Sequence, residues 1–218
     1  IKTEEVENKN NYNIRDYMKE GYKTTFIKDI NGEIKGYEDK KISEKDGSYI
    51  ETTVNLFSGK SIKIDEKTGF GFNVFIGENT LVFRSKSKLL FYIIDGYLQK
   101  EYTPFERKMY HRASLSLNGY FVCSHFYQKE NTHIIHFYSP QGEDLWQYEI
   151  AANCGITAIK TSSNGNYVAL TYRCNSTMID NYLLILNKHG EIIYDNIFEE
   201  NIISVPNIYF NQTEEYVN

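Results

Sequence analysis

Short apolar runs separated by glycine-containing turns recur along the chain, and each run has the length of one β-strand. The stretch 156–198 shows the pattern most fully, with ITAIKTSSNGNYVALTYRCNSTMIDNYLLILNKHGEIIYDNIF. Its hairpin turns fall at Asn164-Gly165 and His189-Gly190, because such dipeptides tolerate the positive φ angles of a tight two-residue turn. We predict a four-stranded antiparallel meander here, and similar units after Phe70 and Tyr110, with a repeat of about 40 to 50 residues.

The apolar character of these strands indicates how the units pack. The segments YVAL, YLLIL, HIIHFY and KLLFYII are apolar at consecutive positions, so both of their faces must be covered. Antiparallel hairpins normally leave one face in water, and stacking each small sheet between two others removes that conflict. The prediction is an all-β fold, a small β-propeller of four or five blades.

The two ends of the chain suggest how the ring closes. Tyr22–Ile42 reads as the second half of a blade that turns at Asn31-Gly32, and Asn207–Val217 reads as a first half. A blade split between the termini would close the ring and remove its open edges. The stretch 46–69 fits the repeat poorly, and the alternative is a piece of a larger propeller. Residues 1–21 are expected to be a polar arm with one or two helical turns at most, and 22–218 a single domain.

Two stretches resemble known propeller repeats. GEDLWQYEI, Gly142–Ile150, resembles the outer strand of the pyrroloquinoline-quinone-type repeat, in which an aromatic residue after a turn glycine packs between blades. SSNGNYVAL, Ser162–Leu170, is similar to the inner hairpin of tryptophan-aspartate-repeat-like propellers. The chain has no Trp-Asp pair, and the acidic residue expected shortly before Gly142 is missing. The resemblance therefore implies the fold, and no catalytic residue is carried over.

Composition and charge exclude some partners. The formal net charge of the 218 residues is -5, which argues against a nucleic-acid partner, since phosphate binding needs a basic footprint. The longest apolar run, Leu89–Ile94, is too short to span a bilayer. Because the sequence begins at Ile1, we expect that an upstream segment has been removed, and the compartment stays open, export included.

Sequence signatures of catalysis and of metal binding are missing, so we expect no catalytic residue, metal or cofactor. His133 and His136 are three apart on a predicted strand and point to opposite faces, so they cannot chelate one ion together. Asp29, Asn31 and Glu33 surround a turn glycine, and turn chemistry explains them.

The three cysteines divide into two groups. Cys123 is equivalent to Ala169 of the next unit and should be a small buried residue. A turn at Asn164-Gly165 places Cys154 opposite Asn175 and therefore diagonal to Cys174. A disulfide between them is geometrically possible and would indicate an oxidising compartment, and the alternative is two neighbouring free thiols.

The two rims of the predicted propeller differ. Tight glycine turns occupy one rim, whereas longer loops occupy the other, where binding residues usually concentrate. The long loops are rich in basic residues, which could steer an acidic partner. The predicted binding residues are Arg84, Lys86, Arg107, Lys108, Tyr127, Lys129, Arg173 and Asp180.

These observations favour a non-catalytic propeller that binds a protein or peptide partner through its long loops. One alternative is a small propeller that binds or hydrolyses carbohydrate, which for hydrolysis would need two carboxylates facing each other across a site. Another is a structural part of a larger propeller or assembly. The sequence does not identify the ligand or the oligomeric state.

Overall fold

The computed structural model describes residues 12–45, 49–64, 73–84, 88–94, 96–102, 109–127, 132–151, 153–174, 180–198 and 210. Within them, the chain forms four antiparallel sheets of four strands each, in which each strand pairs with the next one along the chain. One short 3-10 helix, η1 (Ile14–Tyr17), precedes them. None of the described helical segments is long and apolar enough to cross a membrane.

The strands follow one another without crossovers. The first sheet holds β1 (Tyr22–Lys28), β2 (Ile34–Ile42), β3 (Tyr49–Leu56) and β4 (Ser61–Ile64). The second holds β5 (Asn73–Ile76), β6 (Thr80–Arg84), β7 (Leu89–Ile93) and β8 (Leu98–Tyr102). The third holds β9 (Met109–Leu115), β10 (Phe121–Tyr127), β11 (Thr132–Tyr138) and β12 (Asp144–Ile150). The fourth holds β13 (Cys154–Thr161), β14 (Tyr167–Cys174), β15 (Asp180–Asn187) and β16 (Ile192–Phe198).

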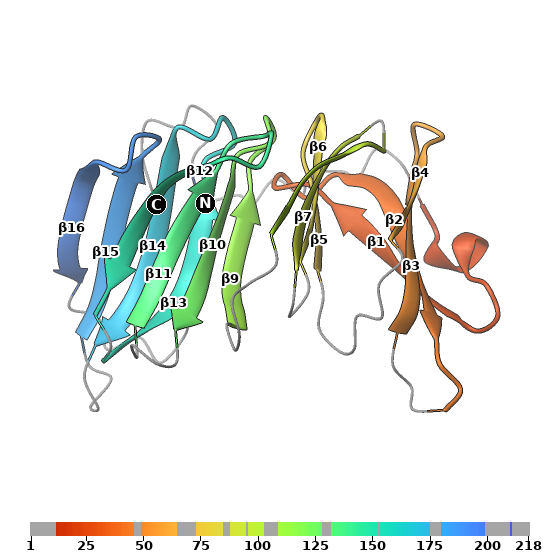
Figure 1. Cartoon of the computed structure of the whole chain (residues 1–218), viewed down its shortest axis with the longest axis horizontal. Coiled ribbons are helices and arrows are strands. Elements are labelled where there is room, and N and C mark those ends of the chain that lie inside the picture. The colour runs from red at the N-terminus through yellow and green to blue at the C-terminus, as the bar shows by residue number, and fades with distance from the viewer. Residues whose placement is uncertain are drawn as a thin grey trace, which may run out of the picture.

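The four sheets are arranged as the blades of a β-propeller, which confirms the predicted fold class. The first strands of successive sheets, β1, β5, β9 and β13, contact one another and form the inner wall. All four run toward the rim that carries the tight turns. Figure 1 shows the sheets side by side, with tight turns such as β3–β4 and β15–β16 at the upper edge.

Three hydrophobic cores lie between successive sheets. The core between the first and second sheets includes Ile27, Val54 and Phe83. The core between the second and third includes Phe91 and Phe121, and the core between the third and fourth includes Val122, Phe137, Leu170 and Leu184. Both faces of the middle sheets are therefore buried, which is why their strands are apolar at consecutive positions.

The predicted split blade is wrong for the N-terminal part of the chain. β1 and β2, which cover Tyr22–Ile42, continue directly into β3 by antiparallel pairing of β2 with β3. The stretch 46–69, which fitted the repeat poorly, thus supplies the outer strands β3 and β4 of an ordinary four-stranded sheet. The likeness of FIKDINGEI to LLILNKHGEI reflects a shared turn chemistry and not a shared place in the blade. The proposed closing half, Asn207–Val217, lies outside the described residues except for Phe210.

The outer face of the first sheet is covered by the segment around η1. The Tyr12 ring stacks on Phe57 at 4.1 Å between centroids, and the Tyr17 ring packs on Tyr37 at 4.7 Å. Lys19 Nζ lies 2.9 Å from Oδ2 of the buried Asp39. This segment therefore supplies apolar contacts and a charge partner to a sheet face that no neighbouring described sheet covers.

The tight turns share one side-chain device. Asp29 Oδ1 accepts hydrogen bonds from the backbone N–H groups of Asn31 and Glu33, at 2.9 and 3.0 Å. The side-chain oxygens of Ser139 and Asn187 likewise accept hydrogen bonds from the backbone N–H groups two and four residues further along the chain. In each of these three turns, the third residue after the capping residue is a glycine with a positive φ angle. These are three-residue hairpin loops, not the two-residue turns that the sequence suggested, and the capping side chains satisfy the extra backbone N–H groups.

Hydrogen bonds between turns run around the inner rim. Glu78 N donates to Leu117 O at 2.6 Å, and Leu117 N donates to Ser163 O at 2.9 Å, which joins the second, third and fourth sheets. Ser163 Oγ donates to Asn31 Oδ1 at 3.4 Å and thereby links the fourth sheet to the first. We call this edge of the molecule the tight-turn rim.

Aromatic residues on the outer strands dock on the turn of the next sheet. Trp146 of β12 stacks on Phe137 at 5.0 Å, and its Nε1 donates to Lys188 O at 3.1 Å. Tyr102 of β8 donates its hydroxyl to Gly142 O at 2.5 Å in the same way. The contact between blades that the resemblance implied for the aromatic residue after Gly142 is thus present.

Glycines in these turns also permit close packing between sheets. Gly165 has φ of +71°, and a Cβ added there would lie 2.5 Å from Cδ2 of Tyr120 in the third sheet. Gly32 has φ of +83°, but a Cβ there would meet nothing within 4 Å. Both positions thus require a positive φ angle, but only Gly165 is closely packed against a neighbouring sheet.

We therefore predict that Gly165→Ala lowers the free energy of unfolding more than Gly32→Ala. The left-handed conformation costs either alanine about 1 to 2 kcal/mol, and overpacking against Tyr120 should cost Gly165→Ala about 1 to 3 kcal/mol more. Urea unfolding of both variants measures the difference. Equal losses of unfolding free energy in the two variants would show that position 165 is not tightly packed against Tyr120.

Candidate binding rim

Seven connections begin and end at the edge of the molecule opposite the tight-turn rim, and they include the three longest connections between the described strands, 43–48, 65–72 and 103–108. They join β2 to β3, β4 to β5, β6 to β7, β8 to β9, β10 to β11, β12 to β13 and β14 to β15. We call this edge the long-loop rim. It is the edge at which the sequence predicted binding, and its described part consists of strand ends and the residues that flank them.

Arg84 lies at the end of β6, on the side of the second sheet that faces the third. Its Nη2 donates to Asn73 Oδ1 at 2.7 Å, and its guanidinium lies 5.4 Å from the centre of the Phe75 ring. Nearby, Lys88 Nζ forms an ion pair with Glu101 Oε1 at 2.9 Å. The basic groups of this strand end are therefore oriented by neighbours within their own sheet.

Tyr127 lies at the end of β10, above a buried polar strip that sequence reasoning missed. His136 Nδ1 lies 2.9 Å from Asp144 Oδ2, and the His125 and His136 rings are 4.4 Å apart. The Tyr127 hydroxyl lies 3.5 Å from His136 Nε2. The strip fills the outer part of the interface between the second and third sheets with mutually bonded polar groups.

A sequence signal for this strip did exist. His125 and Tyr127 follow Cys123 at alternate positions of β10, and His136 is the register partner of Cys123 on β11, so all four share one face. His133, by contrast, packs on Phe126 on the other face at 4.8 Å, as predicted. Cys123 is fully buried, which confirms its assignment, and this burial raises the pKa of its thiol.

The remaining predicted binding residues lie apart from Arg84 and Tyr127. Arg173 is on β14 in the fourth sheet, where its Nε donates to Asn181 Oδ1 at 2.6 Å. Asp180 begins β15 opposite Cys174. Lys86, Arg107, Lys108 and Lys129 lie outside the described residues. The structure thus places Arg84 and Tyr127 at one interface between sheets, and Arg173 and Asp180 on another sheet.

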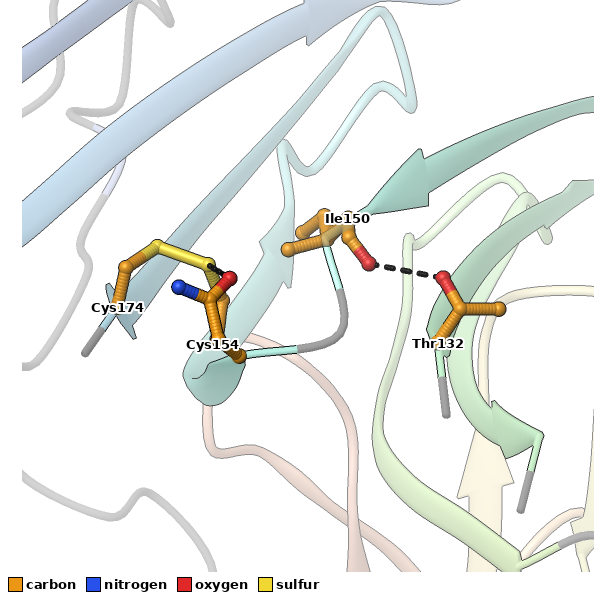
Figure 2. Close-up of a disulfide and its surroundings, with 5 residues drawn as sticks. Thr132, Ile150, Cys154 and Cys174 are labelled. Atoms are coloured by element: carbon orange, nitrogen blue, oxygen red, sulfur yellow. Dashed lines mark hydrogen bonds between the residues drawn. A yellow bond between two sulfur atoms is a disulfide. The ribbon is translucent and has the colours of Figure 1, made fainter. Parts of the chain in front are cut away.

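A disulfide joins the bases of two connections at this rim. Cys154, at the start of β13, and Cys174, at the end of β14, are bonded with Cα atoms 4.0 Å apart. Figure 2 shows the bridge beside Ile150, whose carbonyl accepts a hydrogen bond from Thr132 Oγ1 at 3.0 Å. The ends of β11, β12, β13 and β14 are therefore tied together where their connections begin.

The pairing of the two cysteines differs from the sequence register. Near the turn the observed pairs, such as Thr161 with Val168, follow the predicted register, but a bulge between Ile156 and Ala158 shifts the rest by one residue. Cys154 therefore lies directly opposite Cys174 and not opposite Asn175. Thr157, the extra residue, donates its hydroxyl to the Thr171 carbonyl at 3.0 Å, which offers a local reason for the bulge.

Within the described part of the chain, no group of three or more His, Cys, Asp or Glu side chains is arranged to hold a metal ion. The described residues at the rim include the cationic Arg84, Lys88 and Arg173, the tyrosine Tyr127, and the acidic Glu101 and Asp180.

Comparison with known proteins gives the fold and no family. No model of a known protein family matches the chain, and no curated protein does. Among solved structures, a eukaryotic initiation factor is 14% identical with a TM-score of 0.56, over 82% of this chain and 43% of that one. Prolyl oligopeptidase B from Galerina marginata is 12% identical with a TM-score of 0.50, over 81% and 26%. The Pan2 WD40 domain from Neurospora crassa is 15% identical with a TM-score of 0.47, over 76% and 50%.

The chain thus spans half or less of the length of each of these structures. At such identities the likeness concerns the propeller fold alone, and a fold does not by itself determine function. Their own activities are not transferred to this chain.

We predict that replacing Cys154 and Cys174 by serine lowers the free energy of unfolding by about 3 kcal/mol, since the bridge closes a loop of about 20 residues. Urea unfolding measures this loss. Dithiothreitol should destabilise the wild type by a similar amount and leave the double variant unchanged. Two results would contradict the bridge: a wild-type stability that dithiothreitol does not change, and reaction of all three thiols after unfolding without reductant.

Proposed function

We propose that this chain is a non-catalytic β-propeller that binds a protein or peptide partner through its long-loop rim. The observation that carries the proposal is the difference between the two rims. The tight-turn rim is tied together by hydrogen bonds between turns of different sheets. The long-loop rim carries the three longest connections between the described strands, and the Cys154–Cys174 bond and the hydrogen bond from Thr132 to Ile150 tie strand ends together at that rim. Rigid frames that present long loops are the usual setting of binding residues.

The charge of the loops indicates an acidic partner. Lys86, Arg107, Lys108 and Lys129 fall within the connections that follow β6, β8 and β10. Arg84, at the base of the first of these connections, is held by Asn73 and Phe75. Basic groups concentrated on one rim of an acidic protein would steer an acidic peptide to that rim and raise its association rate.

A contact surface of this kind also needs an apolar or aromatic element. Tyr127 is half-buried, and its hydroxyl is anchored to His136, so its ring is held in place at the end of β10. A tyrosine fixed in this way loses little conformational entropy on binding. We infer that Tyr127 contributes the packing contact and that the neighbouring basic loops contribute the charge.

The test begins with selection of peptides from a displayed random library against the wild-type domain. We expect acidic peptides to be enriched. The triple variant Lys86→Glu, Arg107→Glu, Lys129→Glu should then weaken the Kd of a selected peptide at least about tenfold, because three attractive charges become repulsive. Arg84→Glu is added in a second step, since Arg84 also has contacts within its sheet.

The matched control reverses three lysines near the tight-turn rim, as Lys60→Glu, Lys100→Glu, Lys188→Glu, and changes the net charge by the same amount. This control should leave the Kd within about twofold. If both triple variants weaken binding equally, overall charge and not the long-loop rim accounts for it. If no peptide is selected, the proposal fails for peptide ligands.

A further inference from the structure

A pocket of about 170 Å³ lies where the four inner strands meet, beside the tight-turn rim. Its lining includes Lys28 and Asp29 from the end of β1, Phe75 and Ile76 from β5, Ser114 from β9 and Lys160 from β13. Every sheet therefore contributes to it. It lies at the opposite end of the strands from the long-loop rim.

The acidic group of the pocket is already engaged. Asp29 Oδ1 accepts two backbone N–H groups, from Asn31 and Glu33. Asp29 Oδ2 lies 3.2 Å from Lys35 Nζ. Lys35 also pairs with Glu33 at 2.7 Å, and neither lysine of the pocket forms an ion pair with Asp29.

Those two lysines, Lys28 and Lys160, are exposed and have no hydrogen bond or ion pair with any described residue. They are far apart in the sequence and lie on the inner strands of the first and fourth sheets, β1 and β13. Ile27 and Ile159, their chain neighbours, are buried in the cores that face the second and third sheets. Because side chains alternate along a strand, Lys160 belongs to the face of the fourth sheet that does not pack against the third. Lys28 follows the irregularity that shifts the β1–β2 register after Ile27.

The frame that holds the two lysines is rigid. The turns that follow β1 and β13 are joined by the hydrogen bond from Ser163 Oγ to Asn31 Oδ1. Ser114 Oγ accepts a hydrogen bond from Thr161 N at 3.2 Å, which fixes β9 to β13 at the pocket wall. The positions of Lys28 and Lys160 around the pocket are therefore set by ordered turns.

The size of the pocket limits its ligand. A volume of about 170 Å³ equals the share of about five or six water molecules in the liquid. Pockets for drug-sized ligands begin at about 300 Å³. We propose that this pocket binds a small oxyanion, either phosphate or a carboxylate, between Lys28 and Lys160. This site is separate from the long-loop rim, so it goes beyond the proposed function.

The experiment is a titration of the isotopically labelled chain with inorganic phosphate, and separately with acetate, followed by amide NMR at constant ionic strength. We expect saturable shifts of the amides of Ala113, Ser114, Leu115 and Lys160 with a Kd at or below about 1 mM. Saturation by phosphate alone would identify a phosphate site. Saturation by acetate as well would identify a general oxyanion site that also accepts carboxylates.

The deciding variant is Lys28→Gln with Lys160→Gln, which should weaken the affinity at least about tenfold by removing both charges. The control is Lys41→Gln with Lys188→Gln, which removes two exposed lysines of the same two sheets away from the pocket and should leave the Kd unchanged. Absence of saturable shifts, or equal weakening by both pairs, would overturn the proposal. The peptide selected against the long-loop rim should bind the Lys28→Gln, Lys160→Gln protein normally, so the two proposals can fail independently.

Discussion

The two middle sheets of this protein have two apolar faces, and covering both of them is the constraint on which the rest of the structure depends. A four-stranded antiparallel sheet alone would leave one face in water, at a cost of about 25 cal/mol for each Å² of apolar surface. Successive sheets solve this for one another through the three cores between them. At the first sheet, whose outer face has no described sheet against it, the segment around η1 supplies Tyr12 and Tyr17.

The packing of the sheets against one another also makes the two rims structurally different. Close approach of the inner strands brings the tight turns of different sheets within hydrogen-bond distance, as between Leu117 and Ser163. It also seats Trp146 against the turn at Gly190. That rim is therefore occupied by structural contacts, apart from the pocket between Lys28 and Lys160. The other rim carries the three longest connections between the described strands, and surface loops on a rigid frame can vary without disturbing the cores.

Sequence reasoning found the fold class and most strand positions because consecutive apolar residues and glycine turns report directly on burial and on hairpins. Sequence reasoning failed where similar residue patterns arose from a shared turn and not from a shared position in the sheet. FIKDINGEI and LLILNKHGEI look alike because Asp29 and Asn187 cap the same kind of turn, although β1 and β2 are the inner strands of their sheet and β15 and β16 the outer strands of theirs. The register at Cys154 could not be foreseen, since the bulge at Thr157 depends on a hydroxyl finding the Thr171 carbonyl.

The candidate sites divide in the same way. The strand ends that carry Arg84 and Tyr127 were predictable from the rim to which each strand runs. The spacing of His125 and Tyr127 after Cys123 could have indicated the polar strip, but the pairing of His136 with Asp144 could not be predicted, because Asp144 belongs to a strand whose register was unknown. The pocket between Lys28 and Lys160 joins residues far apart in the sequence, and no local pattern relates them.

The most direct test of the central claim is amide hydrogen exchange of the domain with and without a bound peptide. The account predicts added protection in the connections 85–87, 103–108, 128–131 and 175–179, and unchanged exchange at the tight turns around Gly119, Gly142 and Gly165. Protection confined to the tight turns, with the long connections unaffected, would contradict the assignment of binding to the long-loop rim.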